Sequence, residues 1–471
     1  MPSYSKLLPY HHLRFVDPSH DCHALHRFGG SNPRNRDIAS PMSEQSPFES
    51  TLHQSSTSPS WRAWIEPWYA VYALLGAVSA GLLPILIPLF VHQQGTAAEV
   101  GLVMAALNAS GLLAPLWSWL ADRYRWHRQI IAGGMALTAI GTTIFMFVTN
   151  AVLWAVIALL LNLGAIAAAT IANLLIIERF PRTEWDERLG WLQTAYGGGQ
   201  VFGLLITAFL GQTDLRMGFG ITALCCFIGM GIAWRFVRTP SAARPTIPLL
   251  RHHPKHTDGM FSSPYQLLHH LNPTLICNRN GILTTPLSVW LGVWLLAASG
   301  AGSFFALYPI VMQQVFSIAP SIAAGGFAVA AALGLLLYAP AGDLMHRIGP
   351  LAVVRYALIV RAGACALLWL IGNVSVGFVP VITIFIIIVL SWSFISVSAT
   401  DLTALLSPVE GGESIGLFNA ISALANIIGA SLGGWIAVQF GYPAVIAWAA
   451  LGVACGAAGT YILRPPPQAA S

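Results

Sequence analysis

The sequence predicts an all-α polytopic membrane protein, with twelve transmembrane helices in two pseudo-symmetric six-helix halves and both termini in the cytosol. Three observations support this fold class: composition, a series of long apolar runs, and basic residues confined to alternate loops. The chain of 471 residues is 56% hydrophobic and only 9% charged, whereas a soluble domain carries about 25% charged residues. So little charge cannot cover a water-exposed surface, so the lipid bilayer is the expected solvent and partner.

The apolar runs have the length of membrane-spanning helices. Such a helix needs roughly 20 apolar residues, and the runs lack the two-residue alternation of membrane strands, which are only about 10 residues long. Only helices satisfy the backbone of runs this long inside the bilayer. We expect spans at about 68–91, 97–121, 129–149, 151–177, 189–211, 216–236, 288–315, 320–341, 351–371, 376–406, 414–439 and 443–463.

These runs divide the chain into five parts. The first part is rich in Ser, His and Pro and lacks the apolar stretch of a signal peptide, so we expect a disordered cytosolic tail. A start at Met42 would instead make 1–41 a gene-model extension. The parts are the tail 1–65, the N-terminal half 66–237, a cytosolic linker 238–287, the C-terminal half 288–463 and the tail 464–471.

The basic residues predict the orientation. With the N-terminus inside, 21 of the 23 Lys and Arg residues fall in inside segments, and only Arg216 lies in an outside loop. Arg361 falls within a span. This asymmetry explains the positive charge by topology, so we expect no nucleic-acid partner.

Cysteine and histidine give no sign of a cofactor or a metal. The six cysteines form no CxxC pair, and four of them lie inside apolar runs, where they fit as small apolar residues. The histidines of the linker lie in a segment without the convergent geometry of a metal site. The spans also lack the clustered His, Asp or Glu of an integral membrane enzyme. We therefore expect neither cofactor nor metal, and no enzyme.

The two halves repeat each other. The segment "ERLGWLQTAYGGGQVFG" (187–203) aligns without gaps to "ESIGLFNAISALANIIG" (413–429) at an offset of 226. The alignment pairs Gln193 with Asn419 and Gln200 with Asn426. A charged stretch, "SWLADRYR" (118–125), aligns to "GDLMHRIG" (342–349) at an offset of 224. Matched polar residues and glycines argue against a chance similarity of apolar segments.

This layout resembles the major facilitator superfamily over roughly 66–463. The charged stretch is similar to the family's loop signature G-x-L-A-D-R-x-G-R-R between spans 2 and 3. Ser118 and Arg125 stand where the signature has glycine, and His346 stands where the second copy would have the acid. The matching residues are Leu120, Ala121, Asp122 and Arg123, and then Gly342, Leu344, Arg347 and Gly349.

The resemblance implies a secondary transporter whose loop gates the inside face. We expect Asp122 and Arg123 to form this gate, with His346 and Arg347 as its weaker counterpart, by pairing that breaks when the two halves rock. The alternative is that these charges only anchor the topology.

The resemblance also places the substrate near the membrane midplane, between the halves. Polar and aromatic residues of the spans are therefore candidates for the cavity lining, and helix–helix hydrogen bonding or packing is the alternative for each. The candidates are Asn108, Asn162, Gln193, Tyr196, Gln200, Trp294, Trp392, Asn419 and Asn426. Asp401 and Arg361 are candidates for coupling, although Asp401 also fits a cytosolic cap and Arg361 also fits a carbonyl contact or an anion site.

Sparse charge in the spans favours a small neutral or amphipathic solute, sugar-like or xenobiotic, that crosses the membrane by alternating access. The alternatives are a transport-inactive sensor on the same fold and an integral membrane enzyme. Span 4 lacks the arginine, and span 5 the proline-containing glycine motif, of the family's proton-coupled drug antiporters, so a coupling proton or cation stays open. We expect a multi-pass monomer in the cell membrane, the inner membrane of a bacterium.

Overall fold

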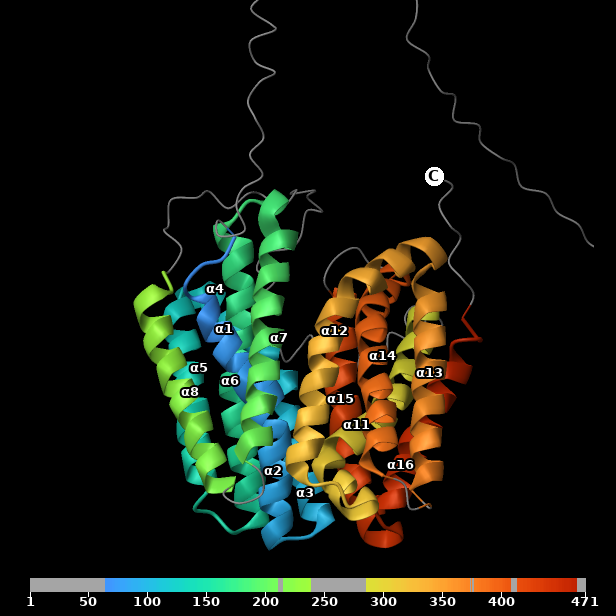
Figure 1. Ribbon diagram of the computed structural model, residues 1–471. Helices are drawn as coiled ribbons and strands as arrows, with labels where there is room; N and C mark the ends of the chain where they lie inside the picture. The colour runs from blue at the N-terminus through green and yellow to red at the C-terminus, as the bar shows by residue number, and fades with distance from the viewer. Residues whose placement is uncertain are drawn as a thin grey trace, which may run out of the picture. The chain divides into compact units, whose positions relative to one another are not determined.

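A computed structural model describes residues 64–210, 215–238, 285–372, 374, 377–407 and 413–463, which belong to one compact unit, Pro59–Ser471. Within these ranges all regular structure is helical (Figure 1). Most of the two predicted tails and of the central linker, including Met42 and the linker histidines, lies outside the described residues.

The N-terminal half follows the predicted order of spans. The first span is an α-helix, a π-helical turn and a second α-helix, and the second span is interrupted by a 3₁₀ turn. The elements are α1 (Tyr69–Gly76), η2 (Ala77–Leu82), α2 (Leu83–Gln94), α3 (Ala97–Ala109), η3 (Ser110–Leu113), α4 (Ala114–Tyr124), α5 (His127–Phe145), α6 (Ala151–Arg179), η4 (Arg182–Glu184), α7 (Trp185–Leu210) and α8 (Leu215–Phe236).

The C-terminal half consists of six uninterrupted helices. The longest starts this half and contains Pro309, which leaves the helix continuous. The elements are α11 (Pro286–Phe316), α12 (Pro320–Ile348), α13 (Pro350–Ile371), α14 (Phe378–Leu405), α15 (Glu413–Phe440) and α16 (Tyr442–Gly459).

Local sequence explains where several of the helices begin. Thr96 and Glu99 form a reciprocal capping box at the start of α3, in which Thr96 N–H donates to Glu99 Oε2 at 2.6 Å. Asn150 Oδ1 accepts from the N–H groups of Val152 and Leu153 and caps α6. Proline near the first turn starts α11, α12, α13 and α16, where its missing N–H costs no helical hydrogen bond.

Ten of the helical stretches are long and apolar enough to cross a membrane by length and composition. The two predicted spans outside this set are α5 and α7, and each begins with polar residues. His127, Arg128 and Gln129 occupy the first turn of α5, which has 19 residues. With α5 and α7 added to these ten, the described part of the chain has six long helical stretches in each half.

Large apolar side chains cover the outside of the bundle. Phe209 is 90% exposed near the end of α7, and Leu336 is 73% exposed in the middle of α12. Exposed apolar residues of this size recur on α5, α6, α8, α13 and α14. A bilayer removes the cost of this exposure, which accounts for the low charge of the chain.

Glycine seams hold each half together at matching positions. A methyl group on Gly203 of α7 would collide with the carbonyl oxygen of Ala77 on η2, and one on Gly429 of α15 would collide with that of Ser299 on α11. Gly203 and Gly429 are the pair that the sequence repeat aligns, so the repeat is also a repeat of packing. Small residues let membrane helices approach this closely.

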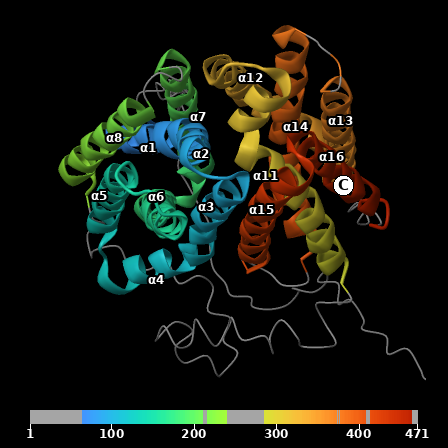
Figure 2. The same cartoon turned by 90° about the horizontal axis from the view of Figure 1, so that it is seen from below.

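Two helix pairs form the most extensive contacts between the halves (Figure 2). Helix α3 packs on α15, where Gly101 and Gly434 approach so closely that a methyl group on either would lie 2.9 Å from the Cα of the other. Helix α7 packs on α12, where Leu335 fills the space beside Gly197. The same two helices, α7 and α15, therefore bind their own half and contact the opposite one.

We expect Gly203→Ala and Gly429→Ala each to lower thermal stability, because overpacking costs about 1–3 kcal/mol. The matched control is Gly198→Ala, one turn from these seams, where an added methyl meets no atom within 4 Å. There alanine should raise stability slightly, because it favours a helix over glycine by about 1 kcal/mol. Thermal unfolding of the purified variants in detergent measures both effects, and equal behaviour of all three would contradict the seam.

Candidate functional site

A cavity of about 590 Å³ lies between the two halves. The N-terminal half contributes η3, α4 and α6, and the C-terminal half contributes the first turns of α15. Its lining is mainly apolar, with a few polar groups among small residues. The apolar lining includes Leu112, Ala114, Pro115, Trp119 and Ala420, and the polar lining is Ser118, Arg123, Thr170 and Asn419.

The charged loop borders this cavity, and its backbone explains part of the family signature. Helix α4 ends at Tyr124, and Arg125 has φ +55° and ψ +33°, the left-handed region, with its N–H donating to Ala121 O at 2.7 Å. In the second copy Gly349 has φ +83°, and its N–H donates to Met345 O at 2.9 Å. The second glycine of the signature thus supplies a positive φ, which Arg125 adopts here at an energetic cost.

The predicted gating residues lie at this end of the bundle. Arg123 is exposed and contributes to the cavity lining, while His346 and Arg347 are exposed in the last turn of α12. The side chain of Asp122 lies outside the described part of the structure. Among the described side chains no carboxylate forms an ion pair with Arg123, His346 or Arg347.

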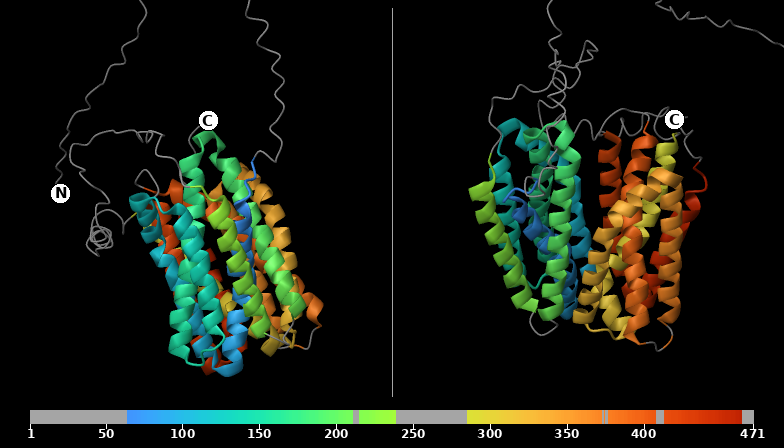
Figure 3. Two further views of the ribbon diagram at one scale, coloured as in Figure 1. Left: turned by 90° about the vertical axis from the view of Figure 1, so that its left-hand side faces the viewer. Right: turned by 45° about the horizontal axis from the view of Figure 1, so that its top comes forward.

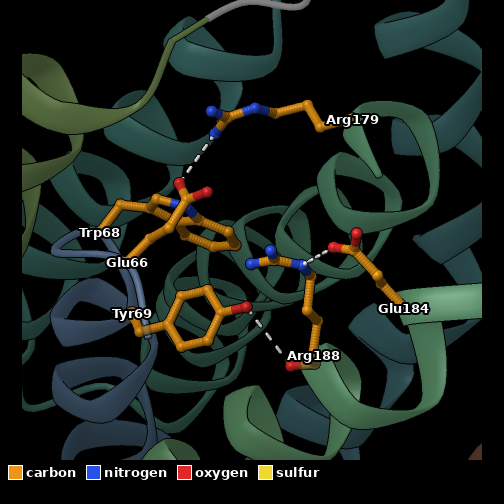
Figure 4. Close-up of polar contacts among 6 residues, drawn as sticks. All are labelled: Glu66, Trp68, Tyr69, Arg179, Glu184 and Arg188. Atoms are coloured by element: carbon orange, nitrogen blue, oxygen red, sulfur yellow. Dashed lines mark hydrogen bonds and ion pairs between the residues drawn. The ribbon is translucent and has the colours of Figure 1, made fainter. Parts of the chain in front are cut away.

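The described ion pairs lie instead within the N-terminal half, beside the start of α1 (Figure 4). Arg179 Nη1 donates to Glu66 Oε2 at 3.1 Å, and the indole N–H of Trp68 donates to the same oxygen at 2.7 Å. Arg188 Nε donates to Glu184 Oε2 at 2.8 Å within the first turns of α7. These contacts fasten the segment before α1 to the ends of α6 and α7.

A third pair joins α5 to α6 just after the charged loop. His127 Nε2 lies 3.1 Å from Glu178 Oε2, and the imidazole is almost fully buried. Neither ring nitrogen meets the geometry of a hydrogen bond. The sequence analysis did not predict a role for Glu66, His127 or Glu178. For the two glutamates, the only signal in the sequence was an acid at the edge of an apolar run.

The polar residues of the N-terminal half come together on α1, α6 and α7. Asn173 Nδ2 donates to the Tyr72 hydroxyl at 3.2 Å, and Gln193 Nε2 donates to Asn173 Oδ1 at 3.4 Å and to the Tyr72 hydroxyl at 3.5 Å. The ring of Tyr196 lies 5.1 Å from that of Tyr72. Gln193 is exposed although it belongs to this cluster, so its amide can also bind a solute.

Aromatic residues take the corresponding place in the C-terminal half. The Trp294 indole N–H donates to Ser422 Oγ at 2.7 Å, and its ring lies 4.9 Å from Phe418 and 6.2 Å from Trp392. Trp294 is buried at 3% exposure, whereas Trp392 is 44% exposed. Of the two predicted tryptophans, Trp392 presents a free surface and Trp294 supports it.

The remaining predicted amides divide between cavity and seam. Asn419 is exposed and lines the cavity. Gln200 is half-buried on α7, where its backbone oxygen adjoins Gly81, and Asn426 is half-buried beside Gly302 of α11.

The two amides of spans 2 and 4 bond to backbone carbonyls. Asn108 Nδ2 donates to Met104 O at 2.7 Å, within its own helix. Asn162 Nδ2 donates to Leu107 O and to Ser110 Oγ, both at 2.8 Å, and so ties α6 to α3 and η3. Only the Asn162 contacts are therefore of the helix–helix type.

The two coupling candidates differ in their surroundings. Asp401 is half-buried near the end of α14, and no described ion pair involves it. Arg361 is 4% exposed in the middle of α13 and lies between aromatic rings. Among the described His, Cys, Asp and Glu side chains, none gather in a group that could hold a metal.

The opposite end of the bundle is packed shut. Besides the α3–α15 and α7–α12 contacts, the Tyr442 hydroxyl of α16 lies 3.4 Å from His92 Nδ1 of α2, with the rings edge to face. The helices of the two halves meet at this end and diverge toward the cavity end (Figures 1 and 3). The site is thus a cavity with one closed end.

Comparison with known proteins fits this geometry. A sequence profile described as "Major Facilitator Superfamily" matches residues 68–410. The chain belongs to this superfamily. Its fold is therefore that of a membrane transporter with two six-helix halves, as the repeat and the loop signature predicted.

Two curated relatives are named for multidrug resistance. The chain is 27% identical over 256 residues to "Multidrug resistance protein MdtG" of Dickeya zeae (strain Ech586), a match that covers 53% of this chain and 57% of that protein. It is 26% identical over 215 residues to "Multi-drug resistance efflux pump PmrA" of Streptococcus pneumoniae (strain ATCC BAA-334 / TIGR4), covering 43% and 51%. The chain thus spans little more than half the length of the curated relatives it matches.

Solved structures show the same fold at low sequence identity. The nucleoside transporter NupG matches with a TM-score of 0.64 at 14% identity, covering 85% of this chain and 98% of that one. A D-xylose-proton symporter matches with a TM-score of 0.64 at 13% identity, covering 85% and 96%. Both are transporters of small molecules, and the superfamily member described here is similar to them in fold.

We expect Arg125→Gly to raise the stability of this superfamily member by up to about 1 kcal/mol. Glycine adopts the left-handed conformation without the cost of about 1–2 kcal/mol that a side chain pays, and part of the gain is lost to unfolded-state entropy. Tyr124→Gly, one residue earlier in helical geometry, is the control and should lower stability. Thermal unfolding compares the two; a loss of stability in both would argue against strain at Arg125.

Proposed function

We propose that the protein is a secondary active transporter that moves a small neutral or amphipathic solute by alternating access, an amphipathic xenobiotic rather than a sugar. The observation that carries this proposal is the cavity of about 590 Å³ between the halves, opposite a packed end. One open and one closed end describe one of the two states that alternating access requires.

The lining supports an amphipathic solute. Leu112, Pro115 and Trp119 offer apolar contact area, while Thr170 and Asn419 offer hydrogen bonds at a few positions. Small-molecule sites combine these features, with an apolar wall for affinity and a few polar groups for orientation. The partial similarity to a multidrug resistance protein and to a multi-drug resistance efflux pump points in the same direction.

The distribution of basic residues supports the direction of opening. Arg123 borders the cavity, and the basic loops that predict the cytosolic face lie at the same end of the helices. On this assignment the described conformation faces the cytosol. Asp122 and Arg123, the gate residues, then form their charge pairs when this end closes. The second copy of the gate is the weaker one, because His346 stands where the first copy has an acid.

We expect Asp122→Asn to abolish or sharply slow solute flux while membrane insertion stays normal, because the neutral amide loses its charge-assisted bonds in the closed state. Asp343→Asn is the matched control, since Asp343 is an exposed acid in the corresponding segment of the second half. Flux of a sugar, a nucleoside and a fluorescent amphiphile into reconstituted vesicles measures both variants. Wild-type flux in Asp122→Asn would refute the gate.

We expect a crosslink across the packed end to stop transport reversibly. In a protein with its six native cysteines replaced by serine, His92→Cys and Tyr442→Cys are joined by a short, reducible bifunctional thiol reagent. Flux should fall at least tenfold and return on reduction, because the closed end must open in each cycle.

The control crosslink joins two helices of one half, with Thr138→Cys on α5 and Leu161→Cys on α6, which are in contact. It should leave flux unchanged, since each half moves as a body. Undiminished flux with the His92–Tyr442 ends joined would refute alternating access about this closure. Solute turnover without vectorial movement would instead favour an enzyme.

A further inference from the structure

Arg361 is a buried cation inside the C-terminal half. It lies in the middle of α13, a helix of span length, and is 4% exposed. An ionised side chain at this depth in a membrane is costly, and it is kept where it pairs or serves a function. The question is therefore which group compensates its charge.

The side chain contacts two aromatic rings. Its Cζ lies 5.2 Å from the ring centroid of Phe305 on α11 and 5.6 Å from that of Trp392 on α14. Cation–π contacts attract the guanidinium, but they compensate the cost of burying an unpaired ion only in part. The rings also accept no hydrogen bond in the plane of the guanidinium.

A protein counter-charge is missing from the described part of the chain. The described ion pairs all lie in the N-terminal half, and no described carboxylate reaches Arg361. Its Nε is buried without a hydrogen-bond partner. A guanidinium with two rings beside it and donors left unused is arranged to accept an anion.

Arg355, two turns earlier on the same helix, shows what a structural arginine looks like here. Its Nε donates to Thr460 Oγ1 at 3.2 Å, its Nη2 donates to Thr460 O at 2.9 Å, and its Cζ lies 4.2 Å over the ring of Tyr461. The contacts of Arg355 thus join α13 to the two residues that follow α16. The contrast with Arg361 argues against a purely structural role for the latter.

Trp392 connects Arg361 to a free surface. The indole contacts the guanidinium, yet it is 44% exposed and lies 6.2 Å from the ring of Trp294. A ring-bearing solute can stack on this exposed face while an acidic group reaches past the indole to the guanidinium. Aromatic stacking stabilises such a contact beyond the effect of the buried area.

We propose that Arg361 binds the carboxylate of the transported solute, and that this solute is an amphipathic carboxylate whose ring-bearing apolar part packs on Trp392. This rests on the proposed transport function and narrows the amphipathic solute to an acid. The planar guanidinium suits a carboxylate because two parallel N–H···O bonds match its two oxygens.

The test measures binding to the purified full-length protein in lipid nanodiscs by quenching of tryptophan fluorescence. Pyrenebutyrate is the carboxylate probe, and pyrenebutanol is its neutral counterpart with the same ring and chain. The wild-type protein should bind the carboxylate at least tenfold more tightly. In Arg361→Met this preference should disappear while binding of the alcohol stays within twofold, and Arg361→Lys should retain part of the preference.

Arg355→Met is the control, because it removes a cation from the same helix and should leave the preference intact. Thermal unfolding gives an independent readout, since pyrenebutyrate should raise the Tm of the wild type but not that of Arg361→Met. Without ligand, Arg361→Met should unfold at a temperature equal to or higher than the wild type, because an uncompensated charge is gone. A lower Tm would indicate a structural partner and overturn the proposal.

Equal binding of the two probes by the wild type, or an unchanged preference in Arg361→Met, would also overturn it. These outcomes are distinct from failure of the transport proposal. Vesicle flux of neutral solutes without any carboxylate preference refutes the anion site alone. Carboxylate binding that depends on Arg361, with no flux of any solute, refutes transport and leaves the anion site standing.

Discussion

The close approach of helix backbones at glycine is the interaction on which the rest of the structure depends. Gly203 brings α7 against η2, and Gly429 brings α15 against α11. On their other faces, α7 and α15 contact the opposite half, where Gly434 of α15 packs against Gly101 of α3. In a bilayer, association gains little from the hydrophobic effect, so close packing decides which helices pair. The cavity exists because α15 is held in this way beside η3 and α4.

The two halves share a backbone but not a chemistry. In the N-terminal half, Tyr72, Asn173 and Gln193 form a hydrogen-bonded cluster that a neutral polar group can join. In the C-terminal half, the exposed ring of Trp392 lies against the buried guanidinium of Arg361. The two halves thus offer different groups: hydrogen-bonding amides in one, and an aromatic ring beside a cation in the other.

The two copies of the charged loop share a positive φ but differ in the rest of the backbone conformation. Arg125 has φ +55° and ψ +33°, whereas Gly349 has φ +83° and ψ +153°. Two positions after Arg125, His127 is buried against Glu178. The ion pairs of Glu66 with Arg179 and of Arg188 with Glu184 lie at the neighbouring helix ends.

The sequence by itself determined the spans, the two-fold repeat and the loop signature, because bilayer thickness and the cost of buried backbone leave one solution for long apolar runs. It also named Asn419, Trp392 and Arg361, since polar and aromatic residues are conspicuous among apolar ones. Only the tertiary structure decided which of them share a site. In the structure Asn162 forms a helix–helix hydrogen bond, Arg361 lies between Phe305 and Trp392, and His92 contacts Tyr442. These contacts join residues up to 350 positions apart, and packing rather than local sequence sets them.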